Sequence, residues 1–424
     1  MIARPRGNIL NGIPDGGMVE SCIREHILGV SRLERLRAYY DGRHAIDVRV
    51  RSAGMPNLRM THAFPRYIST MASGYLIGNP VRYECTDQIE EMENVLREYQ
   101  RSAIDSVDAE LARNASIYGK GVELIFSDGE ARPCSAALDP RDAFVVYEDS
   151  VEQRPMMGVY LMPWRMPDGR LKGYFVYIYT DSHILRYRVK NLSDPRLGTP
   201  EDVQGHFFGR VPRVEYWNGE DEKGDFEDVL SLIDAYDLLQ SDRMNDKQQF
   251  VDALLILYGC TLQTDERGRS PGQQLREDKA LSLPDCDARA EWLCKQLSEA
   301  DTEVLENAIK TDIHKMSLVP DLTDEHFAGN SSGVAMRYKL LGLEQLTRIK
   351  ERWFREALRQ RLSAYCRFLN CRGLSAPEPD RVRMIFTRSL PVNELETAQT
   401  LSALSGILPE DELVRRAMGM DGRN

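Results

Sequence analysis

Residues 334–370 read VAMRYKLLGLEQLTRIKERWFREALRQRLSAYCRFLN and form the longest periodic segment of the chain. Apolar side chains recur in it roughly every third or fourth residue: Leu340, Leu343, Leu346, Ile349, Trp353, Ala357 and Leu362. This spacing predicts one amphipathic helix with a single buried stripe. At 1.5 Å per residue the helix would be about 55 Å long. Helices of this length are uncommon in compact enzymes and typical of extended or ring-forming assemblies.

Other segments show the same helical spacing: 15–40, 64–77, 88–118, 225–258 and 298–317, with two shorter ones at 394–404 and 409–418. Gly42 is expected to end the first helix in the left-handed conformation, and Gly119 to end the third. Asp225, with Asp228 three residues later, is the expected N-cap of the fourth. Its last residues, LLILY at 254–258, are also compatible with a strand.

Residues 121–217 have a different sequence pattern, in which short β-prone runs alternate with turn residues. The runs are 122–126, 143–147, 158–162, 174–179, 184–189, 206–208 and 214–217, and one more lies at 382–386. They predict an antiparallel β-rich layer packed on the N-terminal helices. Farther along, two helices bracket a polar insert at 260–293, and a loop at 319–333 precedes the long helix. The 424 residues allow about three domains at about 150 residues each.

The composition excludes several classes of protein. Hydrophobic residues make up 42% and charged residues 29%, which is ordinary for a globular chain and excludes wholesale disorder. The longest uncharged stretch, 67–81, is too short and too polar to span a bilayer. The first residues contain no secretory signal, so we expect a soluble protein made in the cytoplasm. A net charge of −11 argues against a protein that grips duplex DNA. The eight cysteines form no CxxC pair, and buried reduced thiols are expected.

Catalytic motifs are mostly absent. Residues 329–333, GNSSG, match the G-x-S-x-G elbow around Ser331, and a serine hydrolase is therefore one alternative. No buried strand is predicted before Ser331, however, and the last histidine, His326, precedes it. Neither a P-loop nor H-E-x-x-H occurs. Asp312, His314 and Asp324 are candidates for a metal site, but a solvated acidic helix end explains them better. We therefore expect no catalytic site, no metal and no cofactor.

Charge is segregated between two neighbouring segments. Residues 301–330 carry seven acidic and two basic side chains, a net charge of −5, whereas residues 334–370 carry nine basic and three acidic ones, a net charge of +6. Adjacent elements of opposite sign suggest pairing, either within one chain or between identical subunits. Two ordinary solvated faces are the other interpretation.

Eight segments, taken in order, resemble the portal proteins of long-tailed, siphovirus-type phages, over about residues 30–410. They are YYDGRHAI (39–46), NLRM (57–60), GYLIGNPV (74–81), YGKG (118–121), PRDAFVVY (140–147), GDFE (224–227) with LIDAY (232–236), PD (320–321) and SGVAM (332–336). The resemblance implies an α+β portal fold with long stem and tunnel helices, a β-rich wing and a small clip insert. It also implies a non-enzymatic virion protein, usually a homododecamer, at the unique vertex of the capsid.

Through such a ring, double-stranded DNA would be packaged by a terminase and later ejected, without sequence-specific recognition. The implied partners are terminase, a head–tail connector, and the major capsid and scaffolding proteins, with no membrane. The implied regions are a wing at 1–225, a stem helix at 226–259, a clip at 260–297, a second stem helix at 298–318, a tunnel loop at 319–333, a long wing/tunnel helix at 334–372 and a short crown at 373–424.

The resemblance also implies functional residues in two of these regions. Clip residues Glu266, Arg267 and Arg269 would contact partners. The tunnel loop would line the channel with Asp324, Glu325, Phe327, Asn330, Ser331 and Ser332. An acidic wall suits a conduit, because it repels phosphates within about 8–10 Å, the Debye length. A non-viral ring scaffold with the same layout is the second alternative.

Overall fold

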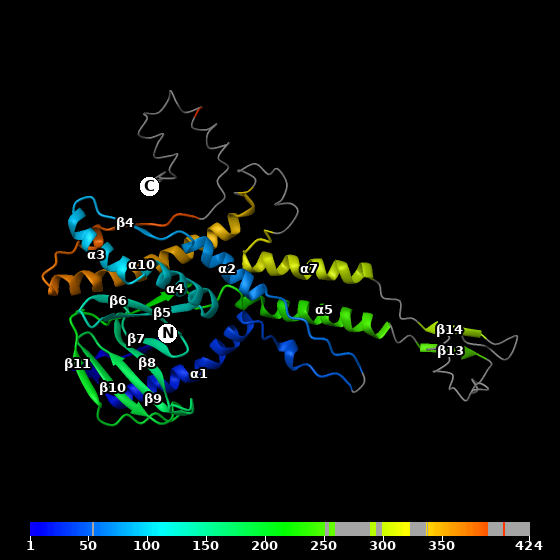
Figure 1. Ribbon diagram of the computed structural model, residues 1–424, viewed down its shortest axis with the longest axis horizontal. Helices are drawn as coiled ribbons and strands as arrows, with labels where there is room; N and C mark the ends of the chain where they lie inside the picture. The colour runs from blue at the N-terminus through cyan, green and yellow to red at the C-terminus, as the bar shows by residue number, and fades with distance from the viewer. Residues whose placement is uncertain are drawn as a thin grey trace. The chain divides into compact units, whose positions relative to one another are not determined.

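The structure is a computed structural model that describes residues 1–52, 55–250, 254–258, 289–293, 299–322 and 338–388, and the single positions 336 and 402. Helices and strands are mixed in an α+β fold (Figure 1). The chain divides into two compact units: the first comprises Met1–Arg43, Ala63–Leu230 and His314–Asn424, and the second His44–His62 and Ser231–Ile313. The helices predicted at 394–404 and 409–418 lie outside the described residues.

The helices are α1 (Gly16–Tyr40), α2 (Phe64–Ile77), α3 (Ile89–Arg101), α4 (Ile104–Tyr118), α5 (Leu230–Phe250), α7 (Glu299–Ser317) and α10 (Leu341–Cys371). The strands are β1 (Ile2–Arg4), β2 (Ile9–Leu10), β3 (Ile13–Pro14), β4 (Arg82–Glu84), β5 (Lys120–Ser127), β6 (Pro133–Leu138), β7 (Ala143–Glu148), β8 (Pro155–Arg165), β9 (Leu171–Tyr179), β10 (His183–Val189), β11 (Asp202–Gly205), β12 (Arg213–Trp217), β13 (Leu254–Tyr258), β14 (Arg289–Leu293) and β15 (Arg383–Ile385). Within these described elements, no helix combines the length and apolar character needed to cross a bilayer.

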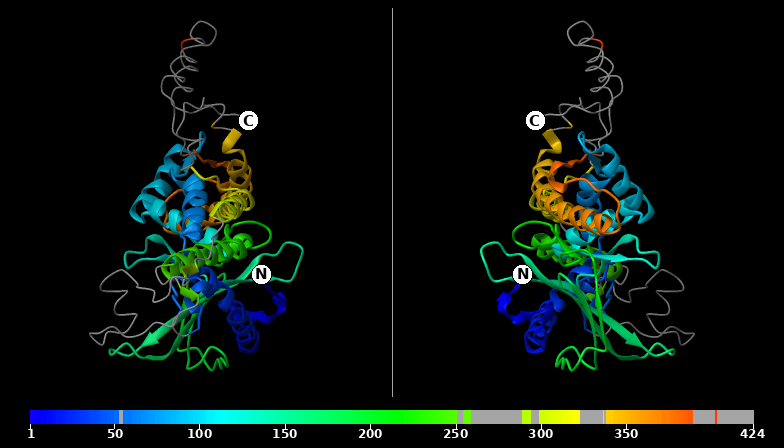
Figure 2. Two further views of the ribbon diagram at one scale, coloured as in Figure 1. Left: turned by 90° about the vertical axis from the view of Figure 1, so that its right-hand side faces the viewer. Right: turned by 90° about the vertical axis from the view of Figure 1, so that its left-hand side faces the viewer.

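A six-stranded sheet forms the first layer of the larger unit. Its order is β1-β7-β8-β9-β10-β11, and all its neighbours are antiparallel except β1 and β7. Helix α1 lies on one side of this sheet (Figure 2) and buries Val19, Cys22 and Ile23 against it. Asp15 caps α1 by accepting the Met18 N–H at 2.9 Å. At the other end Gly42 has φ +84°, the left-handed geometry predicted from the sequence.

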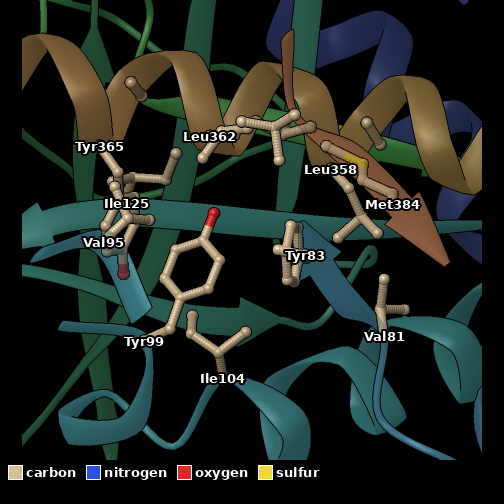
Figure 3. Close-up of a cluster of buried hydrophobic side chains, with 14 of the residues drawn as sticks. Val81, Tyr83, Val95, Tyr99, Ile104, Ile125, Leu358, Leu362, Tyr365 and Met384 are labelled. Atoms are coloured by element: carbon tan, nitrogen blue, oxygen red, sulfur yellow. The ribbon is translucent and has the colours of Figure 1, made fainter. Parts of the chain in front are cut away.

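A second core lies between the helices and the smaller sheet β12-β5-β6. Figure 3 shows its side chains converging from α3, α4, β4, β5, α10 and β15. Tyr83, Tyr99 and Tyr365 meet edge to face there, with centroids of neighbouring rings 5.3 and 5.0 Å apart. Such pairs stabilise a core beyond the area they bury. This core joins α10, late in the chain, to elements formed more than two hundred residues earlier.

The prediction of one helix over 88–118 is wrong, because α3 and α4 are separate helices. Ala103 between them takes the left-handed conformation, with φ 48° and ψ 46°. Tyr99 and Ile104 are both buried in the second core. In a continuous helix, five residues would turn them about 140° apart, so they could not face the same core. The break therefore costs about 1–2 kcal/mol at Ala103 but allows both side chains to be buried.

The predicted strands also differ from those in the structure. Residues 206–208 are not a strand: β11 ends at Gly205, and Phe208 stacks on Phe368 of α10 with ring centroids 4.8 Å apart. Strands β1, β2, β3, β4, β6 and β11 were not predicted. The other six predicted runs in 121–217 fall within β5, β7, β8, β9, β10 and β12.

The helix predicted over 225–258 is shorter in the structure. A 3-10 turn at Glu227–Val229 precedes α5, and residues 254–258 form β13, the alternative noted from the sequence. Asp225 is not a cap. Its carboxylate accepts hydrogen bonds from Ser116 Oγ and Lys350 Nζ, both at 2.5 Å, and from Asn218 Nδ2 at 2.8 Å. Asp225 therefore binds α10 to the 218–225 segment rather than starting α5.

The buried stripe of α10 matches the predicted one only in part. Leu340, Leu343, Ala357 and Leu362 are buried as predicted, but Ile349 and Trp353 are exposed. The buried stripe includes three polar residues, Thr347, Lys350 and Arg361. Apolar periodicity alone could not identify a stripe that depends on polar members.

Arg361 is the most deeply buried cation of α10 and binds two carboxylates. Its Nε donates to Glu123 of β5 at 2.6 Å, and its Nη2 lies 2.6 Å from an Asp108 oxygen on α4. Tyr216 donates to the other Glu123 oxygen at 2.6 Å. Burial raises the pKa of Asp108 to about 6 against the opposing effect of Arg361.

In the second unit, α5 and α7 run side by side (Figure 1). Glu306 of α7 accepts hydrogen bonds from Tyr236 at 3.3 Å and from Arg243 at 2.7 Å. Strands β13 and β14 pair antiparallel, with Leu254 opposite Leu293 and Tyr258 opposite Arg289. The strand that follows α5 in the chain thus pairs with the strand that precedes α7.

The described residues of 44–62 lie along α5 as a strap, which begins with a 3-10 turn at Ala45–Val48. Asp237, Ser241 and Asn245, four residues apart and therefore on one helix face, bind it successively. Asp237 accepts the His62 backbone N–H at 2.9 Å, Ser241 accepts the Met60 N–H at 2.9 Å, and Asn245 bonds both the N–H and C=O of Leu58. This explains why the middle of α5 is almost wholly polar.

The fully buried Asp237 carboxylate also accepts from two imidazoles, His44 at 2.5 Å and His62 at 2.8 Å. Burial acts to raise its pKa, but these hydrogen bonds outweigh burial and hold the pKa below the ordinary value of 3.8. The contribution of Asp237 to stability is therefore fully present above pH 3.8 and is lost as the pH falls below it.

We expect Arg361→Met to lower the free energy of unfolding by about 3–5 kcal/mol, because it leaves two buried carboxylates without their cation. Urea denaturation followed by circular dichroism measures this loss. The matched control is Arg113→Met on α4, whose exposed pair with Glu110 spans 3.6 Å; it should cost less than about 1 kcal/mol. Equal costs for the two variants would contradict a special role for the buried network.

Asp237→Ala should release the strap from α5, because it removes three hydrogen bonds to a buried carboxylate at roughly 1.5–3 kcal/mol each. Limited proteolysis should then cleave within residues 44–62. Asp242→Asn is the control, since Asp242 pairs with Arg49 and Arg51 of the same strap but is itself partly exposed. Equal protease resistance of Asp237→Ala and the unmodified chain would show that the strap does not depend on Asp237.

Candidate functional site

The residues predicted to act on partners and on DNA all lie outside the described residues. These are Glu266, Arg267 and Arg269 of the insert, and Asp324, Glu325, Phe327, Asn330, Ser331 and Ser332 of the loop. The structure does describe the residues on both sides of each segment. The described part of the candidate site therefore consists of the residues that flank the insert and those that flank the loop.

The frame of the insert is the β13–β14 ladder at the far ends of α5 and α7. Tyr258 and Arg289 are the last described residues on either side, and they are direct partners across the ladder. Paired strands are about 4.7–4.9 Å apart. The chain therefore leaves and returns at one place, so the insert can vary without separating the two helices.

The first end of the loop is fixed by His314, near the end of α7. Its ring contacts those of Phe64 and Tyr67 edge to face, with centroids 5.9 and 5.7 Å away. His314 Nδ1 donates to the Val319 carbonyl at 2.9 Å. Between them Leu318 has φ +58°, a left-handed conformation that ends the helix abruptly. The sequence offered no glycine at this position to mark the turn.

Tyr67 of α2 holds the next residues of the loop. Its hydroxyl donates to the Pro320 carbonyl at 2.8 Å and accepts the Leu322 N–H at 3.0 Å. One phenol thus satisfies both a backbone acceptor and a backbone donor. A Phe at this position would leave both groups without their partner, so the hydroxyl itself determines the path of residues 320–322.

The second end of the loop is fixed at the start of α10. A Cβ built on Gly342 would lie 3.6 Å from the Leu318 carbonyl, so the two described ends of the loop adjoin each other. Arg388 donates to Glu344 at 3.1 Å and to Glu351 at 2.6 Å and so ties the first turns of α10 to the 386–388 segment. The loop thus leaves and re-enters one rigid place, between α2 and α10.

Neither catalytic alternative gains support from the described residues near Ser331. The elbow of a hydrolase requires a strand before the serine, and residues 314–322 contain none. Of the metal candidates, Asp324 lies outside the described part. His314 makes the structural contacts given above, with Asp321 4.0 Å from its other nitrogen. No cluster of three potential metal ligands occurs among the residues that the structure describes.

The thiols are only partly as predicted. Cys22 and Cys366 are buried, and burial raises their pKa values to about 11 and about 12, which makes them unreactive. Cys371 is exposed, contrary to expectation. The cysteines at 260, 286 and 294 lie outside the described residues.

The basic residues of α10 have partners other than the acidic 301–330 segment. Lys350 pairs with Asp225 at 2.5 Å, Arg361 with Asp108 and Glu123, and Arg359 with Asp380 at 3.7 Å. Arg348 and Arg355 pair with glutamates one turn earlier in α10. In the structure, the ion pairs of these five residues are with other parts of the chain. The interpretation as pairing between subunits stays open.

The polar ladder of α5 was missed by sequence reasoning, although a signal existed. Asp237, Ser241 and Asn245 recur every four residues on a helix whose apolar pattern is weak. A buried polar stripe of this spacing predicts a partner that supplies backbone groups rather than side chains. The strap, with NLRM at 57–60, is that partner.

Comparison with known proteins gives a consistent result. A family model described as "Phage portal protein, SPP1 Gp6-like" matches residues 19–424. The portal protein of Bacillus phage SPP1 is 24% identical over 434 residues, covering 95% of this chain and 83% of that protein. The portal protein of Clostridium phage phiCD119 is 23% identical over 254 residues, covering 58% of this chain and 54% of that protein.

Among solved structures, a chain of "Neck of empty GTA particle computed with C6 symmetry" has a TM-score of 0.48 and 14% identity, and the similarity covers 84% of this chain and 90% of that one. The family is assigned from the family model and not from this structure, because the model matches nearly the whole sequence. On that match, this chain belongs to the SPP1 Gp6-like family of phage portal proteins.

Proposed function

We propose that this portal protein assembles into a ring of twelve subunits at one vertex of the phage capsid, and that double-stranded DNA enters and leaves through the ring. The observation that carries the proposal is the family match over residues 19–424. Portal proteins of this family are structural components of the virion and not enzymes. The hydrolase alternative based on Ser331 therefore has no support.

Within the ring, α5 and α7 are the stem, and the segment between them is the clip. The paired Glu306 contacts support a stem, because they hold the two helices together along their length. The stem helix ends at Phe250 rather than at 259, so the clip begins with β13 and returns with β14. The wing at 1–225 contains the six-stranded and the three-stranded sheets of the larger unit, α10 is the long wing/tunnel helix, and residues from 373 onward are the crown.

The proposed partners follow from this arrangement. The clip contacts a terminase during packaging and a head–tail connector afterwards, and the wing faces the major capsid and scaffolding proteins. DNA passes without sequence recognition, and no cofactor or metal takes part. The protein is made in the cytoplasm of the bacterial host before it joins the capsid.

The loop at 319–333 is proposed as the constriction of the channel. Support comes from its two anchored ends, at Tyr67 and at Gly342, which adjoin one rigid place. Asp324 and Glu325 would repel phosphates, and the loop has no Arg or Lys with which to grip base edges. The net charge of −11 agrees with a wall that does not retain DNA.

The protein should form rings in which Glu266, Arg267 and Arg269 contact terminase. We expect native mass spectrometry and electron microscopy to show twelve-subunit rings for the unmodified chain and for the triple alanine variant. The variant should bind terminase about tenfold more weakly, because the loss of about 1.4 kcal/mol over the three positions together is enough for that change.

A chain that stays monomeric in all buffers would contradict the proposal that the protein forms a ring. Loss of the ring in the triple variant alone would show that the insert is an assembly element. Alanine substitutions at Glu152 and Arg154, an exposed pair on a turn of the wing, are the control for terminase binding.

Cross-linking the loops to one another should block DNA passage. Ser331→Cys allows bismaleimide cross-links between neighbouring subunits in a background with Cys371→Ser, which removes the exposed thiol of the described residues, and with Cys260, Cys286 and Cys294 also changed to Ser. Rings should remain intact while packaging falls to background, because a tethered loop cannot follow the moving DNA.

The matched control is Ser150→Cys on an exposed turn of the wing, treated with the same reagent. If packaging continued at the normal rate with the Ser331→Cys loops fully cross-linked, this loop would not be the constriction of the channel.

A further inference from the structure

Helix α10 presents apolar side chains that the described part of the chain leaves exposed. Leu341 and Ile349 are each 50% exposed, and Trp353 is 38% exposed. At 100° per residue, Leu341 and Ile349 lie on the side away from the buried residues Leu343, Thr347 and Lys350, and Trp353 lies at the edge of that side. Scattered exposed apolar residues need no explanation, but several gathered over three turns of one helix mark an interaction surface.

The same face is basic. Arg348 and Arg352 lie between Leu341 and Trp353 and are both exposed. We call Leu341, Arg348, Ile349, Arg352 and Trp353 the α10 face. Its apolar centre extends over twelve residues, about 18 Å of helix.

Helix α7 has an outward face of matching length and opposite sign. Val304 is 71% exposed and Met316 is 58% exposed, and Leu305 lies beside Val304. Asp301 and Asp312 lie on the same side of the helix, where the 100° rotation per residue places them in line with Leu305. We call these five residues the α7 face. Val304 and Met316 are again twelve residues apart.

We infer that the α10 face of one subunit packs against the α7 face of the next subunit. This contact rests on the ring proposed above. A ring closed by rotation needs two different, complementary patches on each subunit, and these two faces meet that requirement. Burying the apolar stripes drives association, and Arg352 with Asp312 sets the orientation. The segregation of charge between residues 301–330 and 334–370 is then a contact between identical chains.

Another acidic surface fits less well. Helix α3 exposes Ile89 and Leu96 beside Glu90 and Glu93. Its two apolar residues are only seven positions apart, about 10 Å, so they match half of the α10 face. The α3 surface therefore serves as the internal comparison in the experiment.

The first test is charge reversal with rescue. Arg352→Glu and Asp312→Arg should each raise the protein concentration at half-assembly by about tenfold, because like charges then oppose each other in the contact. The double variant R352E/D312R should return to within about threefold of the unmodified chain. Glu93→Arg on α3, an equally exposed acidic position, should assemble normally.

The outcomes separate this contact from the proposed function. Single variants that assemble like the unmodified chain, or a double variant no better than the worse single one, would overturn the contact while leaving the ring intact. Rescue of R352E by Glu93→Arg instead of by Asp312→Arg would assign the partner surface to α3 and overturn the α7 face. An unmodified chain that never forms rings would overturn both proposals.

The second test is subunit mixing. Ile349→Asp disables the α10 face and Val304→Asp the α7 face, so each variant alone should be monomeric by native mass spectrometry. Mixed, they retain one intact pair of faces and should stop at the heterodimer. If α10 packed against α10, Val304→Asp would assemble on its own, and that result would overturn the inference. Circular dichroism of both variants checks that these surface changes leave the fold intact.

Discussion

The buried guanidinium of Arg361 is the contact on which the larger unit depends, because it joins α10 to α4 and β5 in one network. Lys350, eleven residues earlier on the same helix, is a second buried cation, held by Asp225. Eleven residues are close to three full turns, so both cations point the same way. Two fixed polar contacts on one side determine the rotation of α10 about its axis. The outward position of Ile349 and Trp353 follows from that rotation.

The second unit uses polar residues differently. Along α5, Asp237, Ser241 and Asn245 satisfy the backbone of an extended strap, in place of the apolar contacts that usually cover a helix. A strand edge or an extended segment carries unmet backbone groups, which cost free energy when they are buried without partners. The polar face supplies those partners in register. This explains how a helix with so little apolar content can hold a second segment of the chain.

The sequence predicted the elements whose signals are local. Helix α2, Phe64–Ile77, matches the predicted 64–77, and Gly42 ends α1 as expected. The errors come from interactions distant in sequence: Ala103 breaks a periodic helix so that Tyr99 and Ile104 reach one core, and buried polar residues define the true stripe of α10. Of the candidate site, the insert and the loop stay predictions from the sequence, and the side chains that hold the residues beside the loop were not predicted. Tyr67 and His314 could not be predicted, because each acts through backbone groups that only the fold brings within reach.

The pairing of Tyr258 with Arg289 has an evolutionary consequence. A segment whose two ends are held side by side can be lengthened, shortened or exchanged at little cost, since doubling the length of a loop adds only about 0.6 kcal/mol of closure entropy. The helices on which it is mounted need not move. Recombination between phages could therefore replace this segment as a cassette while the rest of the subunit stays unchanged. The β13–β14 ladder would be the natural crossover point for such exchange, and the place at which an engineer could graft a foreign segment.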